Sequence, residues 1–502
     1  MTATRPTSTH LQRWILVGSA VGCFVLAWLA ASWRPLWYDE LYTFHVAQEP
    51  SLLATLRALL AGADTNPPLD YLLRHLSMTL LGDSPAAFRL PSVLAFLAGL
   101  FAIYGYVRPR VPFAAAAAAF LAPIGTAAVF FSYEGRAYAL LFCSGALALL
   151  AWQRAVAATT PRRLAVLALA LCVGPFSHYF GVLAFVPPAL GEAWRTVERR
   201  RIDAGIVAAF AVATLASLLL WPIAKLALGM QSAFWASSFS LADAYQYFTG
   251  FLQYSDSPVS IVLACGVVLV LGLLAVPRWR AVLRVPVPAH ELVGAIALAY
   301  TPLLAYVLAS VLTGALTPRY VIAFVPGVAI LLGYLVAVVA AVLPRTAWLA
   351  AACIAALGLG GFVRTLDDLL DEQGFPTELR EVIETTPLPV AFDTPHKFLE
   401  YSYYAPASVR ERFVYPMNAS LAALLRGFNN DEIALRGLAR IEPLRVTDYR
   451  EFTAQTHEFL LVRDLNFAPA LARQLPGDGF CLLQIAQARS VVLLHVTWGC
   501  WD

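Results

Sequence analysis

The sequence predicts a mainly α-helical, polytopic membrane protein with an α/β domain at its C-terminal end. Hydrophobic residues make up 60% of the 502 residues and charged residues only 13%, and the mean hydropathy is +0.68. Soluble domains carry roughly 25% charged residues, so a wholly soluble protein is excluded. The net charge of +3 is too small to indicate nucleic-acid binding.

Long apolar runs predict the membrane spans, because a bilayer core of about 30 Å needs roughly 20 apolar residues per helix. One further stretch, Leu164–Leu190, has basic residues at both flanks and is broken at Pro175 and at Ser177-His178-Tyr179. The positive-inside rule favours a hairpin of two short spans there over one long span, which gives about eleven transmembrane helices. The other predicted spans are Trp14–Ser32, Leu90–Val107, Val111–Phe131, Ala137–Trp152, Ile206–Ile223, Val259–Val276, Leu292–Leu316, Val321–Leu343 and Ala347–Val363.

This topology places the N-terminus inside and the C-terminus outside. The inside loops then hold fifteen Lys or Arg residues and the outside loops seven, leaving aside the C-terminal tail. The first span follows Arg5 and Arg13 as a signal peptide would. Its apolar run is longer than the roughly 7–15 residues of a signal peptide, so we expect it to be retained.

Two domains follow from the composition. Residues 1–363 form the transmembrane module, with residues 34–89 as a large first extracytoplasmic loop, and residues 364–502 form a soluble extracytoplasmic α/β domain. In this tail, an oxidising compartment would permit a disulfide between Cys481 and Cys500. Its predicted helices are Glu378–Glu384, His396–Tyr404 and Ala468–Gln474, and its predicted strands are Val390–Phe392, Phe459–Val462 and Ser490–Val496.

Polar residues gather at the outer ends of the predicted spans, whereas pumps and ion-coupled transporters usually carry acids or histidines in mid-membrane. Tyr38, Asp39 and Glu40 follow the first span, where an aromatic belt at the headgroup level is the structural alternative. Asp64 and Asn66 precede paired prolines, where a loop-to-helix junction with a capping Asp64 or Thr65 is the alternative.

One arginine, Arg136, is a candidate anion ligand at the outer end of a span. Arg136 follows Glu134 and precedes Tyr138, and a structural Glu134–Arg136 ion pair is the alternative to ligand binding. Arg suits phosphate because its guanidinium donates paired hydrogen bonds. The remaining candidates at outer ends of spans are His178, Tyr179, Arg319 and Tyr320, of which the last two also fit a simple interfacial anchor.

Six motifs in order carry a family resemblance: WYDE, DTNPPLDYLL, GDSPAAFRLPSVLAFLAG, FFSYEGRAYAL, SHYFG and PRYVIAFVPG, spread over residues 33–330. In this order they resemble the bacterial polytopic GT-C glycosyltransferases related to protein O-mannosyltransferases and aminoarabinose transferases. The resemblance implies an inverting sugar transfer from a polyprenyl-phosphate donor at the outer face of a bacterial plasma or inner membrane.

The resemblance also implies roles for residues. Asp39 matches the catalytic acid of the first loop and Glu40 its neighbour, while Arg136 and Arg319 match residues near the donor phosphate and His178 a site residue. The substrate-binding candidates are Tyr38, Asp64, Asn66, Glu134, Tyr138, Tyr179 and Tyr320. Aminoarabinose transferases place a Lys where this chain has Asn66, which leaves the phosphate to the arginines.

Elementary chemistry agrees with these roles. A carboxylate can take the proton of the acceptor hydroxyl, and arginines can stabilise the departing lipid phosphate. The acceptor class stays open between glycan, lipid and protein, and the acidic outer loop leaves open a divalent cation as cofactor. The alternative function is a polytopic lipid or glycolipid transporter or flippase without transferase chemistry.

Overall fold

The computed structural model describes residues 9–229, 234, 236, 238–252, 287–370 and 375–499, which fall into two compact units. The first unit comprises residues up to Trp33, Asn66–Trp221 and Phe239–Leu369. The second comprises Arg34–Thr65, Pro222–Ser238 and the chain from Leu370 onwards. The first extracytoplasmic loop of the prediction is therefore divided between the units at residues 65 and 66.

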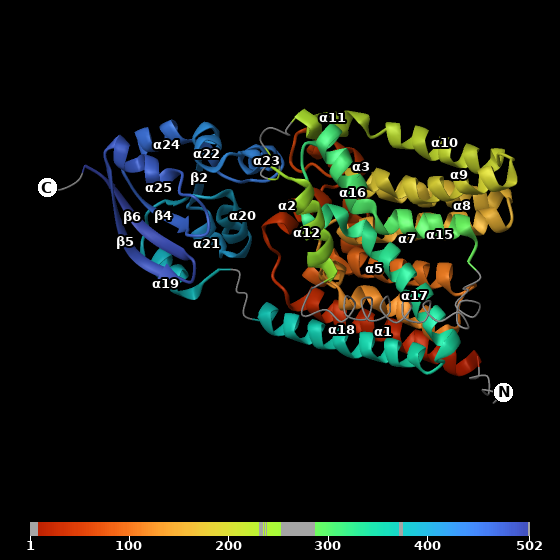
Figure 1. The fold of residues 1–502 in the computed structure, drawn as a ribbon. Coiled ribbons are helices and arrows are strands. Elements are labelled where there is room, and N and C mark those ends of the chain that lie inside the picture. Colours follow the sequence, from red (N-terminus) through yellow and green to blue (C-terminus); the bar gives the residue numbers. More distant parts are fainter. Residues whose placement is uncertain are drawn as a thin grey trace. The chain divides into compact units, whose positions relative to one another are not determined.

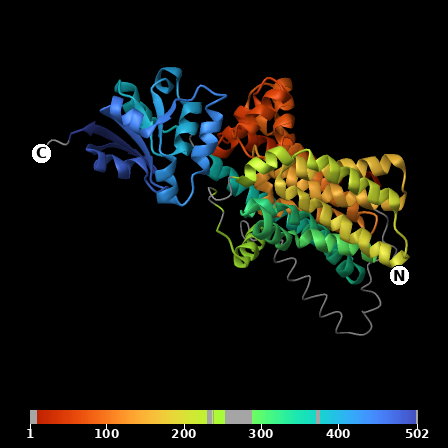
Figure 2. The same cartoon turned by 90° about the horizontal axis from the view of Figure 1, so that it is seen from above.

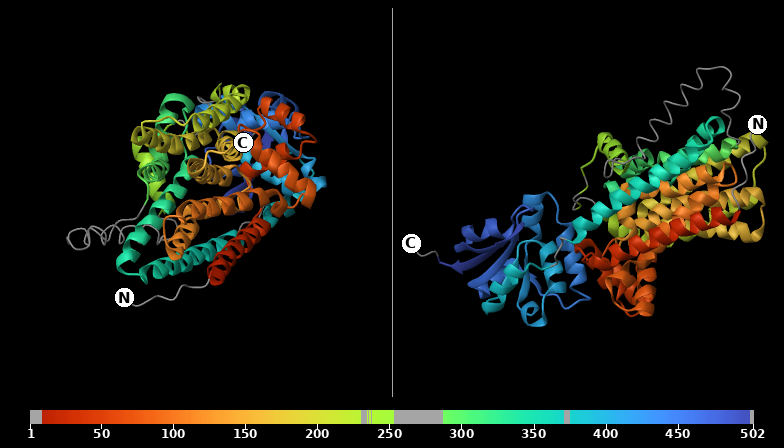
Figure 3. Two further views of the ribbon diagram at one scale, coloured as in Figure 1. Left: turned by 90° about the vertical axis from the view of Figure 1, so that its right-hand side faces the viewer. Right: turned by 90° about the horizontal axis from the view of Figure 1, so that it is seen from below.

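The first unit is a helical bundle whose long helices run roughly parallel or antiparallel to one another (Figures 1 and 3). Large apolar side chains are exposed along its outer helices, for example Val21 in α1 and Leu215 in α10, as expected for surfaces that face lipid. Its helices are α1 (Thr9–Trp33), α4 (Leu69–Leu81), α5 (Pro85–Val107), α6 (Phe113–Leu121), α7 (Tyr138–Ala157), α8 (Pro161–Ser177), α9 (Val186–Arg199), α10 (Ala204–Leu218), α12 (Leu241–Leu252), α15 (Ala289–Ala299), α16 (Thr301–Leu308), α17 (Val325–Val342) and α18 (Thr346–Leu370).

Within the described residues, five helices are long and apolar enough to cross a membrane: His10–Trp33, Pro85–Val107, Tyr138–Ala157, Pro318–Val342 and Thr346–Val363. Two bent helix pairs raise the number to seven if each pair is one span. These seven segments coincide with seven predicted spans. The predicted span Val259–Val276 lies outside the described residues, so the total of about eleven stays a prediction.

Proline accounts for the breaks in the apolar runs, because it removes a backbone donor and disrupts the preceding turn. Helix α10 bends by 57° into α11 (Trp221–Gly229), which has Pro222 in its first turn, and α15 bends by 55° into α16 at Pro302. The predicted span Val111–Phe131 is the short helix α6 followed by the 3₁₀ helices η1 (Ala122–Gly125) and η2 (Ala127–Ser132).

The predicted hairpin at Leu164–Leu190 is present as α8 and α9, which are 17 and 14 residues long and joined by the 3₁₀ helix η3 (Tyr179–Phe185). The chain reverses there because two glycines allow close backbone contact. A Cβ atom on Gly174 would lie 2.4 Å from the carbonyl oxygen of Gly181, and one on Gly181 would lie 2.1 Å from the backbone of Gly174. This contact holds His178 and Tyr179 at the tip of the hairpin.

The second unit contains a six-stranded sheet in the order β3-β2-β1-β4-β6-β5 (Figures 1 and 2). Strands β3, β2, β1 and β4 are parallel, and β6 and β5 are antiparallel to their neighbours. The strands are β1 (Val390–Phe392), β2 (Phe413–Met417), β3 (Val446–Asp448), β4 (Glu458–Asp464), β5 (Phe480–Ala488) and β6 (Val491–Trp498).

Helices cover both faces of this sheet, because alternate residues of the central strands enter two separate cores. Val390 and Phe392 pack with α19 and α20, whereas Ala391 packs with α24 and α25. Strands and helices are present at each of the predicted ranges, and β2, β3 and β5 were not predicted. The helices are α19 (Thr377–Thr385), α20 (Pro395–Tyr404), α21 (Ala407–Arg410), α22 (Ala419–Arg426), α23 (Asn430–Leu438), α24 (Tyr449–Gln455) and α25 (Leu471–Gln474), with the 3₁₀ helix η7 (Leu475–Asp478).

Two helices of the first loop, α2 (Tyr38–Ala47) and α3 (Leu52–Leu60), belong to this second unit. Helix α2 contacts α20 and α23 of the same unit. Cys481 is disulfide-bonded, and Cys500, its predicted partner, lies outside the described residues.

Candidate functional site

A cluster of cationic and aromatic side chains lies in the first unit, where α7, the hairpin tip and the 3₁₀ helix η6 (Pro318–Phe324) meet. The guanidinium carbon of Arg319 is 5.5 Å from the ring centroid of Tyr138, and that ring is 5.8 Å from the ring of His178. The ring of Tyr320 lies 4.8 Å from His178 and 6.5 Å from Tyr138. The structure thus brings together four residues from three segments that lie far apart in the sequence.

His178 is buried between α8 and η3, outside the candidate spans, with Arg136 and Arg319 near enough to act on its charge. Burial lowers the pKa of His178 far below its usual range, and the positive charges of Arg136 and Arg319 lower it further. The backbone N–H of Phe180 donates to Nδ1 of His178 at 3.2 Å. A neutral imidazole with Nδ1 as acceptor carries its proton on Nε2, so His178 can donate a hydrogen bond there.

The loop that carries Arg136 is held by its backbone. Arg74, a fully buried residue of α4, donates to the carbonyl oxygen of Arg136 at 3.0 Å and to the carbonyl of Phe88 at 2.8 Å. The hydroxyl of Ser92 donates to the carbonyl of Glu134 at 2.6 Å. These bonds fix the path of the loop through its carbonyl groups, while the side chain of Arg136 is itself 9% exposed.

Arg74 is in turn held by Asp70, one helical turn earlier. Its Nε and Nη2 atoms donate to the two carboxylate oxygens of Asp70 at 2.9 and 2.8 Å, which is the paired geometry of a strong ion pair. Sequence reasoning missed both residues. The available signal was the spacing of Asp70 and Arg74 four residues apart behind Pro67-Pro68, on a helix that otherwise reads as apolar.

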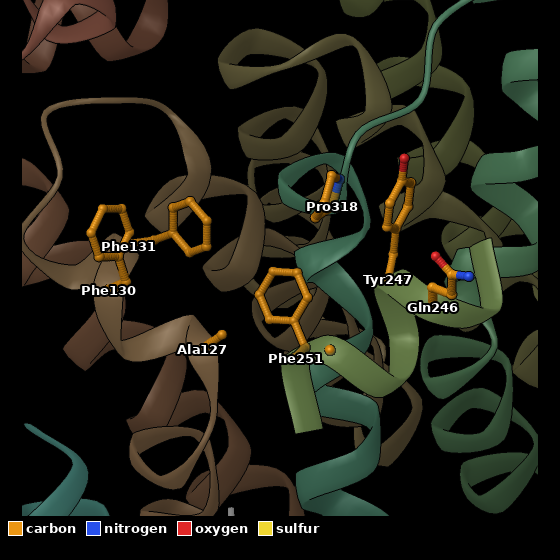
Figure 4. Close-up of a pocket in the computed structure, with 8 residues that line it drawn as sticks. Ala127, Phe130, Phe131, Gln246, Tyr247, Phe251 and Pro318 are labelled. Carbon is orange, nitrogen blue, oxygen red and sulfur yellow. The ribbon is translucent and has the colours of Figure 1, made fainter. Parts of the chain in front are cut away.

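An apolar cavity of about 280 Å³ lies next to this cluster (Figure 4). It is connected to the cluster through two of its residues: Phe131 packs against Tyr138 at 5.3 Å between ring centroids, and Pro318 directly precedes Arg319. Across the cavity, Phe131 and Phe251 face each other at 6.0 Å. The lining residues are Ala127, Phe130, Phe131, Gln246, Tyr247, Gly250, Phe251 and Pro318.

The acid pair lies in the second unit, at the start of α2. Glu40 is fully buried, and its carboxylate accepts the backbone N–H of Trp37 at 3.3 Å, which caps the helix. Asp39 is half-buried. Burial raises the pKa of Tyr38 and of Tyr42, and the carboxylate of Asp431 raises both further, so these phenols stay neutral.

The other predicted residues are placed as follows. Asp64 does not cap α4, whose N-cap is Pro68; its carboxylate accepts from the hydroxyl of Thr43 at 3.4 Å and from the N–H of Thr65 at 2.7 Å. Asn66 and Glu134 are buried in the first unit, and Tyr179 is half-buried at the hairpin tip. Within the described residues, no group of three or more His, Cys, Asp or Glu side chains could hold a metal ion.

Comparisons with known proteins bear on the fold and on one part of the chain. Residues 65–211 match the family of dolichyl-phosphate-mannose-protein mannosyltransferases. The solved structure of ArnT from Cupriavidus metallidurans bound to undecaprenyl phosphate is similar with a TM-score of 0.58 and 16% identity, over 96% of this chain and 98% of that chain. The protein has the ArnT fold. No curated protein matches the chain significantly.

The apo structure of ArnT is similar to the same extent, with a TM-score of 0.57 and 14% identity over 97% of this chain and 98% of that chain. The resemblance drawn from the six motifs is thereby confirmed, since residues 65–211 match a mannosyltransferase family and the chain shares the ArnT fold. Identities of 14–16% show the shared ArnT fold alone. The roles of the individual residues stay predictions.

Proposed function

We propose that the protein is a membrane glycosyltransferase that moves a sugar from a polyprenyl-phosphate donor to an extracytoplasmic acceptor with inversion. The proposal rests on one observation above all: in the first unit, a cationic cluster adjoins an apolar cavity. A polyprenyl phosphate has this same division into a charged head and an apolar tail. ArnT, which shares the fold, has been solved with undecaprenyl phosphate bound.

The cationic cluster suits the phosphate of the donor. The guanidinium groups of Arg136 and Arg319 can each donate paired hydrogen bonds to phosphate oxygens. His178 adds a neutral Nε2–H donor, because its Nδ1 atom accepts from the backbone. The aromatic walls around Phe131 and Phe251 suit the isoprenoid chain.

The reaction needs one base and one stabilised leaving group. Asp39 takes the proton of the acceptor hydroxyl as the acceptor oxygen forms a bond to C1 of the sugar on the face opposite the phosphate. The bond between C1 and the phosphate oxygen breaks, and its electron pair leaves with the lipid phosphate. The negative charge on this phosphate rises during the step, so Arg136 and Arg319 stabilise the transition state more than the bound donor.

The remaining assignments concern Glu40 and the substrate contacts. Glu40 caps α2 through Trp37, so proton transfer is assigned to Asp39 alone. Tyr138 and Tyr320 line the cationic cluster and can contact the sugar. The other proposed substrate contacts are Tyr38, Asp64, Asn66, Glu134 and Tyr179.

A release assay tests the function. Purified full-length protein in nanodiscs is incubated with polyprenyl-phosphate sugars labelled in the sugar, and free polyprenyl phosphate and labelled products are separated. We expect slow hydrolysis of at least one donor, which a membrane acceptor extract accelerates. Movement of intact donor between leaflets without cleavage of any donor would favour the flippase alternative.

The location of the site is tested separately. We propose that the C-terminus lies outside the cytoplasm of a bacterial inner membrane, on the strength of the fifteen-to-seven distribution of basic residues. A reporter that is active only outside the cytoplasm should therefore be active when fused after Asp502. Activity of a cytoplasm-only reporter at this position would show that the number of spans is wrong by one.

A further inference from the structure

Helix α2, which carries Asp39, packs inside its own unit on two helices of the C-terminal domain, α20 and α23 (Figure 1). The ring centroid of Tyr38 lies 3.7 Å from that of the imidazole of His396 in α20, and the interplanar angle is 65°. One helical turn later, the hydroxyl of Tyr42 donates to the carbonyl of Asp431 in α23 at 3.4 Å. The same face of α2 thus meets both helices.

The imidazole of His396 is itself held from two sides. Its Nε2 atom is 3.2 Å from the carboxylate of Asp431. Its ring packs against that of Phe467, with 4.5 Å between the ring centroids. The carboxylate of Asp431 also accepts from the side-chain amide of Asn430 at 2.7 Å. These contacts restrict the orientation of the His396 imidazole, so Tyr38 packs against a ring whose position is already determined.

Both chain segments that flank α2 and α3 are also attached to the C-terminal domain. The hydroxyl of Tyr404 accepts the backbone N–H of Leu36 at 2.5 Å and donates to the carbonyl of Leu36 at 3.1 Å, two residues before α2 begins. Gly437 of α23 lies so close to Gly62 that an added Cβ atom would be 2.4 Å from the carbonyl group of Gly62. The segment that comprises α2 and α3 is therefore held at both ends, and α2 is also held along its length.

From these contacts we propose that His396 is a positioning residue that holds Asp39 in its reactive orientation through Tyr38. The inference rests on the proposed role of Asp39 as general base. Because Asp39 directly follows Tyr38, a shift of the Tyr38 ring turns the start of α2 and moves the carboxylate. Displacements of about 1 Å at a reacting group can lower a rate by about 100-fold.

Steady-state kinetics test the link to turnover. In His396→Ala we expect kcat to fall about 10-fold or more while KM for the donor stays the same, since Arg136 and Arg319 are untouched. His396→Phe keeps a ring against Tyr38 and should recover most of the turnover. His495→Ala is the matched control, because it removes another His–carboxylate pair of the same domain, with Glu458 at 3.0 Å.

Hydrogen exchange tests the positioning itself and does not depend on activity. We expect faster exchange of the backbone amides of α2 (Tyr38–Ala47) in His396→Ala, and wild-type exchange in His495→Ala. A second variant, Gly437→Ala, pushes α23 away from Gly62 and should also loosen the segment before Asp64. Its control is Gly477→Ala, where an added Cβ atom meets nothing within 4 Å.

The outcomes separate this inference from the proposed function. Unchanged exchange in α2 of His396→Ala would overturn the positioning role of His396, as would faster exchange with unchanged kcat. An equal loss of stability and turnover in His396→Phe and His396→Ala would also overturn it. If the wild type cleaves no donor but α2 exchanges faster in the variants, the proposed function fails while the hold of His396 on α2 is supported.

Discussion

The cationic cluster and helix α2, which carries Asp39, are held in place by two different kinds of contact. In the first unit, buried groups of α4 and α5 fix the loop of Arg136 through its carbonyl oxygens, with Arg74 fully buried behind it. In the second unit, α2 is fixed through side chains, chiefly Tyr38 and Tyr42, by helices of the C-terminal domain. Under the proposed function, donor binding and proton transfer therefore depend on different parts of the fold.

This difference predicts a separation of kinetic effects. Changes in or behind the cationic cluster should weaken donor binding and, because the arginines also stabilise the departing phosphate, should lower kcat as well. Changes in or behind α2 should act on proton transfer and appear in kcat. The predictions below test this separation, beginning with the largest expected effect.

Asp39→Asn should lower kcat by about 100- to 10,000-fold, because the amide cannot accept the proton of the acceptor hydroxyl. Donor affinity should stay the same. The matched control is Glu40→Gln, whose amide oxygen can still accept the N–H of Trp37 and which should therefore keep most of its turnover. Single-turnover transfer with the best donor gives both values, and near-normal transfer by Asp39→Asn would remove Asp39 as the base.

Arg74→Ala should lower the free energy of unfolding by about 3–5 kcal/mol, since it leaves the carboxylate of Asp70 buried without its cation. The double variant Asp70→Leu/Arg74→Met should restore much of the stability but not the donor affinity, because the carbonyl of Arg136 still lacks its donor. Thermal unfolding and donor binding are measured together. The control is Arg195→Ala, which breaks another buried ion pair, with Glu192. This variant should bind the donor as tightly as wild type does.

Arg136→Lys should raise KM for the donor roughly 10-fold and Arg136→Ala roughly 100-fold, because lysine keeps the charge but loses the paired geometry. Arg319 should behave in the same way. The competing interpretation is a purely structural pair of Arg136 with Glu134. Recovery of transfer in Glu134→Gln/Arg136→Gln would establish that pair, and a stable but inactive double variant would support phosphate binding.

A smaller effect concerns the stability of the sheet domain at different pH. Burial raises the pKa of Asp393, whose Oδ1 atom accepts the N–H groups of Ala470 and Leu471. The folded state therefore holds a proton that the unfolded chain has already released, and stability falls as pH rises from the ordinary value of about 4 through the raised one. The side-chain amide in Asp393→Asn has no such proton to lose. As the pH rises from 4 to 7, the melting temperature of this variant should therefore rise by a few degrees relative to that of wild type.

The control for this effect is Asp448→Asn. Asp448 is exposed and also accepts two backbone N–H groups, from Arg450 and Glu451, so the comparison isolates burial. Equal pH trends in wild type, Asp393→Asn and Asp448→Asn would contradict the assignment to Asp393.

Apolar runs and charge predicted the membrane helices well, because a span is a local property of composition. The hairpin at His178 was also predictable, from the basic flanks and the polar break at Ser177-His178-Tyr179. The break predicted at Pro175 is absent, since α8 continues through this proline to Ser177. The division of the first loop between two units was not, since it arises from contacts such as Leu36 with Tyr404 that join residues 368 positions apart. Strand β2 is buried at every position, and β3 and β5 show no regular alternation of buried and exposed residues, so periodicity missed them.

The candidate site divides in a similar way. Residues with a chemical signature, such as Arg136, His178 and Arg319, were found from their types and their places at the ends of spans. Arg74 and His396 were missed because their functions depend on what they touch: a carbonyl oxygen 62 residues away and a tyrosine ring in another helix. Sequence patterns show which groups can react, whereas positioning residues become visible only through contacts.

Binding of undecaprenyl phosphate to purified full-length variants tests the central separation most directly. Titration in nanodiscs compares wild type, Asp39→Asn and the double variant Arg136→Ala/Arg319→Ala. We expect Asp39→Asn to bind as tightly as wild type and the double arginine variant to bind at least about 100-fold more weakly. Unchanged binding in the arginine variant, or a comparable loss in Asp39→Asn, would contradict the assignment of the phosphate to the cationic cluster.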